Sequence, residues 1–298
     1  MTLDASYAFC ERIARTHYEN FPVASRLLPS RMRPHVAAIY AFARVADDIA
    51  DEGNAVVAVR NARLDEWIAR LHGATSSASA HSGASTLTPE MAAQAPPIFE
   101  ALANTVRVCE LPVSLLEDLV SAFRQDVTVT RYASWEALFD YCRRSANPVG
   151  RLVLRVAGHR DEDADRSSDA LCTALQLTNF WQDFGRDWRA GRLYVPRDVL
   201  QHCGAREEEL NAASMSDGWV RALGECVRVT RERFDAGRAV CDRVAGRLRF
   251  ELRCTWLGGR RILDRTDRAR RTLLSFRPTL GPADFPGIAW GAARWPPG

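Results

Sequence analysis

Apolar residues recur every three to four positions along most of the chain, which is the spacing of one α-helix face. Alternating β-branched residues are confined to the short run 127–130, so strands are not expected. The sequence therefore predicts an all-α fold of about nine or ten helices. The predicted helices span residues 4–18, 32–52, 55–72, 97–109, 113–126, 134–157, 167–188, 218–246 and 248–275.

Two segments depart from this pattern. Residues 73–97 are rich in Ala, Ser and Thr and contain three prolines, which predicts a flexible surface loop. Residues 278–298 are rich in Pro, Gly and Trp, which predicts an irregular C-terminal tail. No internal repeat is evident. We therefore predict a single domain over residues 1–277, followed by the tail.

Composition narrows the chemistry. All 40 basic residues among the 298 are arginine, which excludes Schiff-base and P-loop lysines. No apolar run is long enough to cross a membrane, and the N-terminus lacks a signal-peptide pattern. The eight cysteines are scattered without a C-x-x-C pair, which indicates reduced, mostly buried thiols. A cytoplasmic location is therefore expected.

Positive charge is concentrated near the C-terminus. Residues 221–277 hold 16 arginines against 7 acids, although the net charge of the chain is only +3. This asymmetry favours an anionic partner, while a solvated helix face with internal ion pairs explains it equally well. Nucleic acid is not expected, because no nucleic-acid-binding motif accompanies the arginines.

The first candidate site lies at the end of a predicted helix. Asp47, Asp48 and Asp51 precede Gly53, where the helix should end. Carboxylates at a helix C-terminus oppose the macrodipole, and pairs such as Asp47 and Asp51 repel each other. A bound cation would reverse this penalty, and clustered carboxylates suit Mg²⁺. A solvated acidic turn is the alternative.

The second candidate site is a polar stripe. Asn179, Asp183 and Asp187 follow each other at intervals of four, and Gln176 lies on the same stripe. Aromatic residues flank the stripe, which favours a face that lines a cavity over a fully exposed face. Taken alone, the segment also fits an ordinary amphipathic helix.

Two carboxylate stripes suit the ionisation of a diphosphate. Several Mg²⁺ ions held between them would neutralise the leaving diphosphate, and arginines would bind it through paired N–H donors. The carbocation that results needs an apolar pocket with aromatic faces. The candidate walls are Phe21, Tyr40, Phe42, Tyr141, Phe180 and Trp181.

At these residues the chain resembles the squalene/phytoene synthase family of head-to-head isoprenoid synthases, over about residues 7–277. The resemblance implies a helical bundle with a central cavity that handles prenyl diphosphates with Mg²⁺. It also implies that His17, Phe21, Tyr40, Arg44, Gln176, Gln182 and Arg277 contact the substrate. The blocks that carry it are residues 17–21 with 27–29, 40–51, 141–150, and 176–187 with 191–196.

Departures from the usual family motifs point to one branch. Asn20, Gln182 and the run Ser145–Ala146–Asn147 replace the residues that are common there. The combination resembles the bacterial branch that converts presqualene diphosphate and water into hydroxysqualene in hopanoid biosynthesis. That reaction needs no hydride donor, so NADPH is not expected. A partner enzyme would supply presqualene diphosphate.

Several of these residues fit a second role as well. Asn147, Asp126 and Gln182 are candidates to position the attacking water. Asn147 equally fits a helix break with Pro148, and Asp126 equally fits a metal neighbour or a partner for Arg131. His17 also fits an ordinary helix histidine, and Arg44 also fits an intrahelical ion pair with Asp48.

Rival functions remain open at this point. The nearest are presqualene diphosphate, squalene, dehydrosqualene and phytoene synthases, followed by a class I terpene cyclase. A helical assembly factor that has kept its acidic stripes is the non-enzyme alternative. Long hydrocarbon substrates also imply peripheral contact with a membrane, at its inner face.

Overall fold

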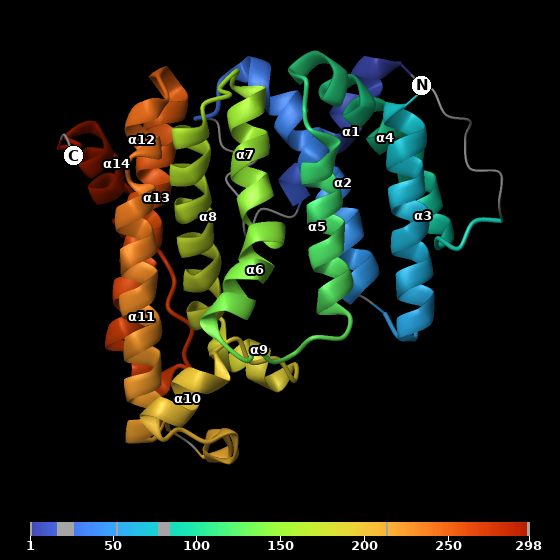
Figure 1. Cartoon of the computed structure of the whole chain (residues 1–298). Helices are drawn as coiled ribbons and strands as arrows, with labels where there is room; N and C mark the ends of the chain where they lie inside the picture. Colours follow the sequence, from blue (N-terminus) through green and yellow to red (C-terminus); the bar gives the residue numbers. More distant parts are fainter. Residues whose placement is uncertain (1, 17–26, 52, 77–83, 213, 297–298) are drawn as a thin grey trace. The chain divides into compact units, whose positions relative to one another are not determined.

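The computed structural model describes residues 2–16, 27–51, 53–76, 84–212 and 214–296. Within these ranges the chain is helical, and its only ladder contact is an isolated bridge between Arg131 and Leu193 (Figure 1). The all-α prediction is confirmed. The helices pack as two compact units, which are described separately below: residues 1–128 with 151–160, and residues 129–150 with 161–298.

The first unit is built around α2, which contacts α1, α3, α4 and α5. Phe42 of α2 is fully buried between Trp67 and Phe99, with ring centroids 5.8 and 6.0 Å away. The apolar face that the sequence pattern predicts is therefore the face that meets the neighbouring helices. The helices of this unit are α1 (Leu3–Thr16), η2 (Ser30–Met32), α2 (Arg33–Asp51), α3 (Val57–Thr75), α4 (Pro89–Cys109) and α5 (Val113–Asp126).

The second unit is built around α8, which packs against α6, α11, α12 and α13. Gly237 and Gly259 allow close approaches to α8, because a Cβ at either position would lie under 3 Å from atoms of Leu171 or Leu175. The helices of this unit are α6 (Trp135–Ser145), α8 (Glu162–Gln182), α9 (Phe184–Arg189), α10 (Arg197–Cys203), η3 (Glu207–Asn211), α11 (Asp217–Gly237), α12 (Val240–Arg243), α13 (Gly246–Arg268), η4 (Arg270–Thr272), η5 (Pro282–Asp284) and α14 (Phe285–Ala293). Helix α7 (Asn147–Val156) begins in this unit and continues into the first.

Two predicted irregular segments are partly helical. Residues 73–75 complete α3, and α4 already begins at Pro89, where a proline is tolerated and Thr88 caps the helix. The predicted loop 73–97 is therefore too long, and its residues 77–83 lie outside the described residues. The prediction of an irregular tail is wrong for α14, which buries Ile288 and Ala292. The single domain over residues 1–277 stays a prediction.

Long predicted helices are divided in the structure. The stretch 134–157 is broken between α6 and α7, next to Asn147 and Pro148. The stretch 167–188 is broken at Asp183, between α8 and α9. The short helix α10, which follows Pro196, was not predicted. No helix in the described ranges is both long and apolar enough to span a bilayer.

All eight cysteines are free thiols, as predicted, and most are buried. Burial raises the pKa of Cys10, Cys142 and Cys172 to about 12. These thiols are therefore protonated and unreactive at neutral pH.

Candidate active site

The first acidic motif lies at the C-terminal end of α2. Asp47 and Asp48 are half-buried, and Asp51 is the exposed last residue of the helix. Ile49 and Ala50 between them are buried against the rest of the unit. The core therefore fixes α2 by its apolar face, and the carboxylates project from the face that the core leaves open.

Arg44, one turn earlier, partly neutralises these carboxylates. Its Nη2 lies 2.5 Å from Oδ1 of Asp48, and its Nη1 lies 3.8 Å from Oδ2 of Asp47. Burial acts to lower the pKa of Arg44, but the charge and hydrogen bond of Asp48 raise this pKa overall. Burial raises the pKa of Tyr40 against the opposing effect of Arg44. At neutral pH the motif therefore offers protonated donors to an anion as well as carboxylates to a cation.

Arg60 of α3 closes the end of the same helix. Its guanidinium donates to the carbonyl oxygen of Ala50 and, at 2.7 Å, to that of Gly53. Gly53 has φ +78°, the left-handed conformation that ends many helices. A positive charge here offsets both the macrodipole and the acidic motif. The sequence analysis did not predict the role of Arg60, because an arginine just after a helix break belongs to no recognisable motif.

The second acidic motif combines a polar stripe with a buried apolar face. Gln176, Asn179, Asp183 and Asp187 are all half-buried. The helix breaks at Asp183, but its backbone N–H still donates to Asn179, at 2.8 Å, and its carbonyl accepts from Asp187, at 3.0 Å. The interval of four is therefore kept across the break. The flanking residues Leu177, Phe180, Trp181 and Phe184 are buried.

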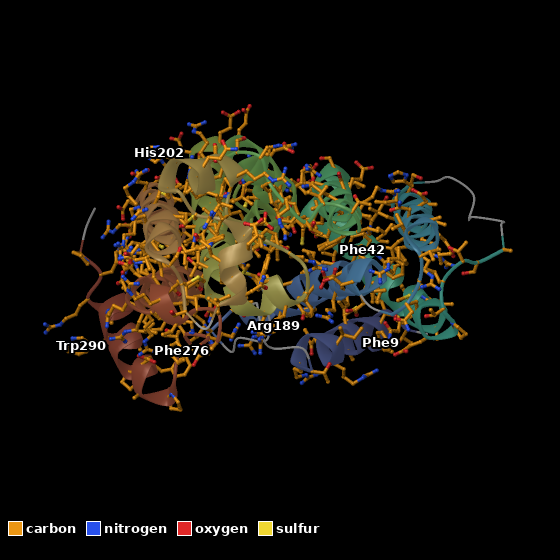
Figure 2. The ribbon with its side chains drawn as sticks, turned by 90° about the horizontal axis from the view of Figure 1, so that it is seen from below. Phe9, Phe42, Arg189, His202, Phe276 and Trp290 are labelled. Atoms are coloured by element: carbon orange, nitrogen blue, oxygen red, sulfur yellow. The ribbon has the colours of Figure 1, made fainter. Side chains whose placement is uncertain are left out.

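Residues 273–278, called the strap below, cross this motif within the second unit. The guanidinium of Arg277 binds the carboxylate of Asp183 through two hydrogen bonds, and Gln182 Nε2 donates to the carbonyl oxygen of Pro278 at 2.6 Å. Arg189, labelled in Figure 2, donates to the carbonyl oxygen of Leu274 at 2.9 Å. Gly185 permits this contact, because a Cβ there would overlap strap carbonyls. The structure thus places Arg277 directly on the second acidic motif.

An aromatic cluster lies in the same unit beside the stripe. Phe180 stacks on Tyr194 with ring centroids 3.7 Å apart, and Tyr141 lies 6.2 Å from Phe180. Tyr132 joins the cluster, 5.6 Å from Tyr141, and all four rings are buried. Trp181 is fully buried: its ring lies 6.3 Å from that of Phe180, and its Nε1 donates to Thr230 Oγ1. Tyr132 and Tyr194 were not predicted as wall residues, because their approach depends on tertiary packing.

The structure shows partners for Asn147 and for Arg131. The Asn147 side chain accepts a hydrogen bond from Thr173 Oγ1 at 2.9 Å, and Asn147 begins α7. The helix break with Pro148, which was the alternative role for Asn147, is present in the structure. Arg131 places its guanidinium on Glu207, at 2.8 Å, and Asp126 is the half-buried last residue of α5. The roles of Asn147 and Asp126 in positioning the attacking water stay predictions.

His17 and Phe21 lie outside the described residues. The two acidic motifs belong to different units, so the prediction that they face each other across a cavity stays a prediction.

The oxygen donors of both motifs fit Mg²⁺ in kind. Carboxylates and the amide of Asn179 are ligands that Mg²⁺ prefers, whereas His and Cys are absent from both motifs. In the described ranges no three acidic, His or Cys side chains already form a metal-binding group. Mg²⁺ typically binds through one or two carboxylates together with substrate phosphates and water. The arginines on Asp48 and Asp183 occupy those carboxylates in this structure.

Comparison with known proteins decides the family. A model of the squalene/phytoene synthase family matches residues 14–284. The chain belongs to the squalene/phytoene synthase family. It is therefore an enzyme of this prenyltransferase-like family.

Relatives with curated names carry the comparison further. A protein named hydroxysqualene synthase from Rhodopseudomonas palustris is 35% identical over 284 residues, covering 94% of this chain and 90% of that protein. A protein of the same name from Zymomonas mobilis is 42% identical over 196 residues, 64% of this chain. That second match spans only 59% of the Zymomonas protein, less than two thirds of its length.

A solved structure agrees over most of the chain. Squalene synthase HpnC from Alicyclobacillus acidocaldarius superposes with a TM-score of 0.79 at 38% sequence identity. The match covers 90% of this chain and 95% of that one. The family member thus has the helical fold that the resemblance implied.

Proposed function

We propose that this family member is a hydroxysqualene synthase that converts presqualene diphosphate and water into hydroxysqualene and diphosphate. The observation that carries the proposal is the relative of that name, which is 35% identical across 94% of the chain. In the reaction the C–O bond to diphosphate breaks and the carbon skeleton rearranges. A water oxygen then bonds to the carbocation and loses a proton.

The arginines of the two motifs are suited to the first step. Bound Mg²⁺ would supply Lewis-acid neutralisation of the leaving diphosphate. Arg44 and Arg277 keep their charge at any physiological pH and present paired N–H donors that match phosphate oxygens. Each now rests on a carboxylate, Asp48 or Asp183. Metal binding by the carboxylates would free these guanidinium groups to bind the diphosphate.

The aromatic cluster is suited to the second step. Buried ring faces attract a carbocation and exclude bulk water, and Tyr141, Phe180 and Tyr194 offer such faces beside the polar stripe. Water must nevertheless reach one carbon. Gln182 and Asn147 are our candidates in this unit to orient that water, and Asp126 is the candidate in the other.

A squalene synthase is the second candidate, because the HpnC structure carries that name. The two functions differ in the last step: hydride delivery gives squalene, and water capture gives hydroxysqualene. Both reactions start from presqualene diphosphate. Either a partner enzyme or this protein itself would make that substrate. A location at the inner face of the cytoplasmic membrane belongs to the same proposal.

The test uses purified protein with Mg²⁺ and either presqualene diphosphate or farnesyl diphosphate. We expect hydroxysqualene from presqualene diphosphate and no hydrocarbon product from farnesyl diphosphate. Turnover of farnesyl diphosphate alone would contradict the specialised function and favour a synthase that carries out both steps.

A further inference from the structure

The short helix α9 carries Asp187, the last carboxylate of the second acidic motif. The helix has only 6 residues, and the break at Asp183 separates it from α8. A helix this short has little stability of its own, so its direction depends on what packs against it. The strap holds it through the close approach at Gly185 and the hydrogen bond of Arg189. The position of Asp187 therefore depends on these contacts and on those at the turn that follows α9.

Arg131 holds the turn that follows α9. Its guanidinium lies over the ring of Trp188, 5.6 Å from the ring centroid, and donates to the carbonyl oxygen of Gly191 at 2.7 Å. Trp188 and Gly191 are the two ends of this turn, since the Gly191 N–H donates to the Trp188 carbonyl at 3.0 Å. The isolated bridge between Arg131 and Leu193 ties the same stretch to residue 131 (Figure 1).

The turn is in turn hydrogen-bonded to Asp187. The backbone N–H of Arg192 donates to the carbonyl oxygen of Asp187 at 2.8 Å. Gly191 has φ +80°, the left-handed conformation that lets the chain reverse direction here. A shift of the turn would therefore move the backbone of Asp187 with it.

Glu207 of η3 holds the guanidinium of Arg131 in this orientation. Nε and Nη2 of Arg131 donate to Oε2 of Glu207 at 2.9 and 2.8 Å, while Nη1 donates to Gly191. The two paired side chains are 20% and 31% exposed, so solvent is partly excluded from the pair. Each nitrogen of the planar guanidinium thus has an acceptor, an arrangement that a lysine ammonium on a flexible stem does not reproduce.

We propose that Arg131 is a positioning residue for Asp187. By holding Trp188 and Gly191 it fixes the turn after α9, and so fixes the position from which Asp187 binds a metal ion. The inference rests on the proposed function, with Asp187 among the Mg²⁺ ligands. Partners that orient a metal ligand typically contribute about 10- to 100-fold to metal affinity. A residue that serves only fold stability would leave the metal affinity of the folded protein unchanged.

The experiment measures Mn²⁺ binding to the purified full chain by electron paramagnetic resonance, which detects the free ion. Mn²⁺ takes the same oxygen ligands as Mg²⁺. The test variant is Arg131→Gln. The matched control is Arg231→Gln, an arginine of the same unit that pairs with Asp264 and Asp267 on α13. We expect the test variant to bind Mn²⁺ about tenfold more weakly than the wild type, and the control to bind it equally well.

Further variants separate positioning from charge and from folding. Arg131→Lys keeps the charge but loses the planar fork, so it should bind Mn²⁺ as weakly as Arg131→Gln. When Asp187→Asn is already present, Arg131→Gln should cause no further loss, because the carboxylate that it positions is gone. Circular dichroism checks that each variant is folded. If Arg131→Gln does not fold, Glu207→Gln keeps Arg131 in place and should weaken Mn²⁺ binding as well.

Several outcomes would overturn the proposal. They are a wild type that binds no Mn²⁺, equal affinities of the wild type and Arg131→Gln, equal loss in the control, full recovery by Arg131→Lys, and an undiminished further loss when Arg131→Gln is added to Asp187→Asn. Formation of hydroxysqualene is measured separately. A wild type that binds Mn²⁺ without making this product would contradict the proposed function and not the positioning role.

Discussion

Glu66 of α3 is an almost buried carboxylate that joins two segments of the first unit. Its side chain is only 4% exposed. One oxygen accepts hydrogen bonds from Arg70 at 2.7 Å and from Ser85 at 2.8 Å. The other accepts from the backbone N–H of Thr86 at 2.6 Å and from its hydroxyl at 2.8 Å. Glu66 thereby ties the segment before α4 to α3.

These donors determine the magnitude of the effect. Burial alone would raise the pKa of Glu66, but the hydrogen bonds from Arg70, Thr86 and Ser85 lower the pKa from 4.5 to about 2. A difference of this size corresponds to about 3 kcal/mol of folding free energy at pH 7. Because the pKa is lower in the folded state, this contribution is complete above pH 4.5 and is lost as the pH falls toward 2.

Glu66→Gln should therefore lower the free energy of unfolding by about 2–3 kcal/mol at pH 7. At pH 3.5 the gap between wild type and variant should narrow by about 1 kcal/mol. Urea denaturation followed by circular dichroism measures both values. The matched control is Asp65→Asn, whose side chain is 67% exposed and pairs with Arg124, and its effect should stay within about 0.5 kcal/mol. A Glu66→Gln effect as small as the control, or a gap independent of pH, would refute the reasoning.

Three further predictions concern the site. Asp183→Asn should reduce turnover about 100-fold or more and raise the Mg²⁺ concentration that turnover requires, and a chelator should abolish turnover of the wild type. If the variant shows the same Mg²⁺ dependence as the wild type, Asp183 is not a metal ligand. Asn147→Ala should lower the share of hydroxysqualene in the product. The control Thr173→Val, which removes only the hydrogen bond to Asn147, should leave that share unchanged. If both variants shift the product equally, the role of Asn147 is purely structural. Gly185→Ala should cost about 1–3 kcal/mol, because the new Cβ overlaps strap carbonyls. Gly281→Ala, which meets open space, should cost little, and equal thermal shifts would contradict this packing.

The sequence predicts the helices well because each buries one continuous apolar face. It also places Asp47 and Asp48 correctly at the end of α2, since the alanine-rich helix and Gly53 are local signals. The break at Asp183 was missed, because the polar residues keep the helical interval of four across it, as do the backbone hydrogen bonds of Asp183. Helix α14 was missed for another reason: its Pro and Gly content suggested a coil, although Pro286 lies in the first turn, where proline is tolerated.

Contacts between distant segments carry no local signal. Arg277 was predicted as a substrate contact, but nothing in its neighbourhood indicates that it binds Asp183. Likewise, Arg60 reaches back across the break at Gly53 to close α2. Both contacts depend on how helices pack, which periodicity alone does not specify. The facing of the two acidic motifs, which the family resemblance implies, remains a prediction for the same reason.

The origin of the product oxygen tests the central claim most directly. Purified protein is incubated with presqualene diphosphate and Mg²⁺ in ¹⁸O-labelled water, without NADPH, and the product is identified by mass spectrometry. We predict hydroxysqualene that carries the label at its hydroxyl oxygen. Squalene that forms only after NADPH is added, with no labelled alcohol, would contradict the account.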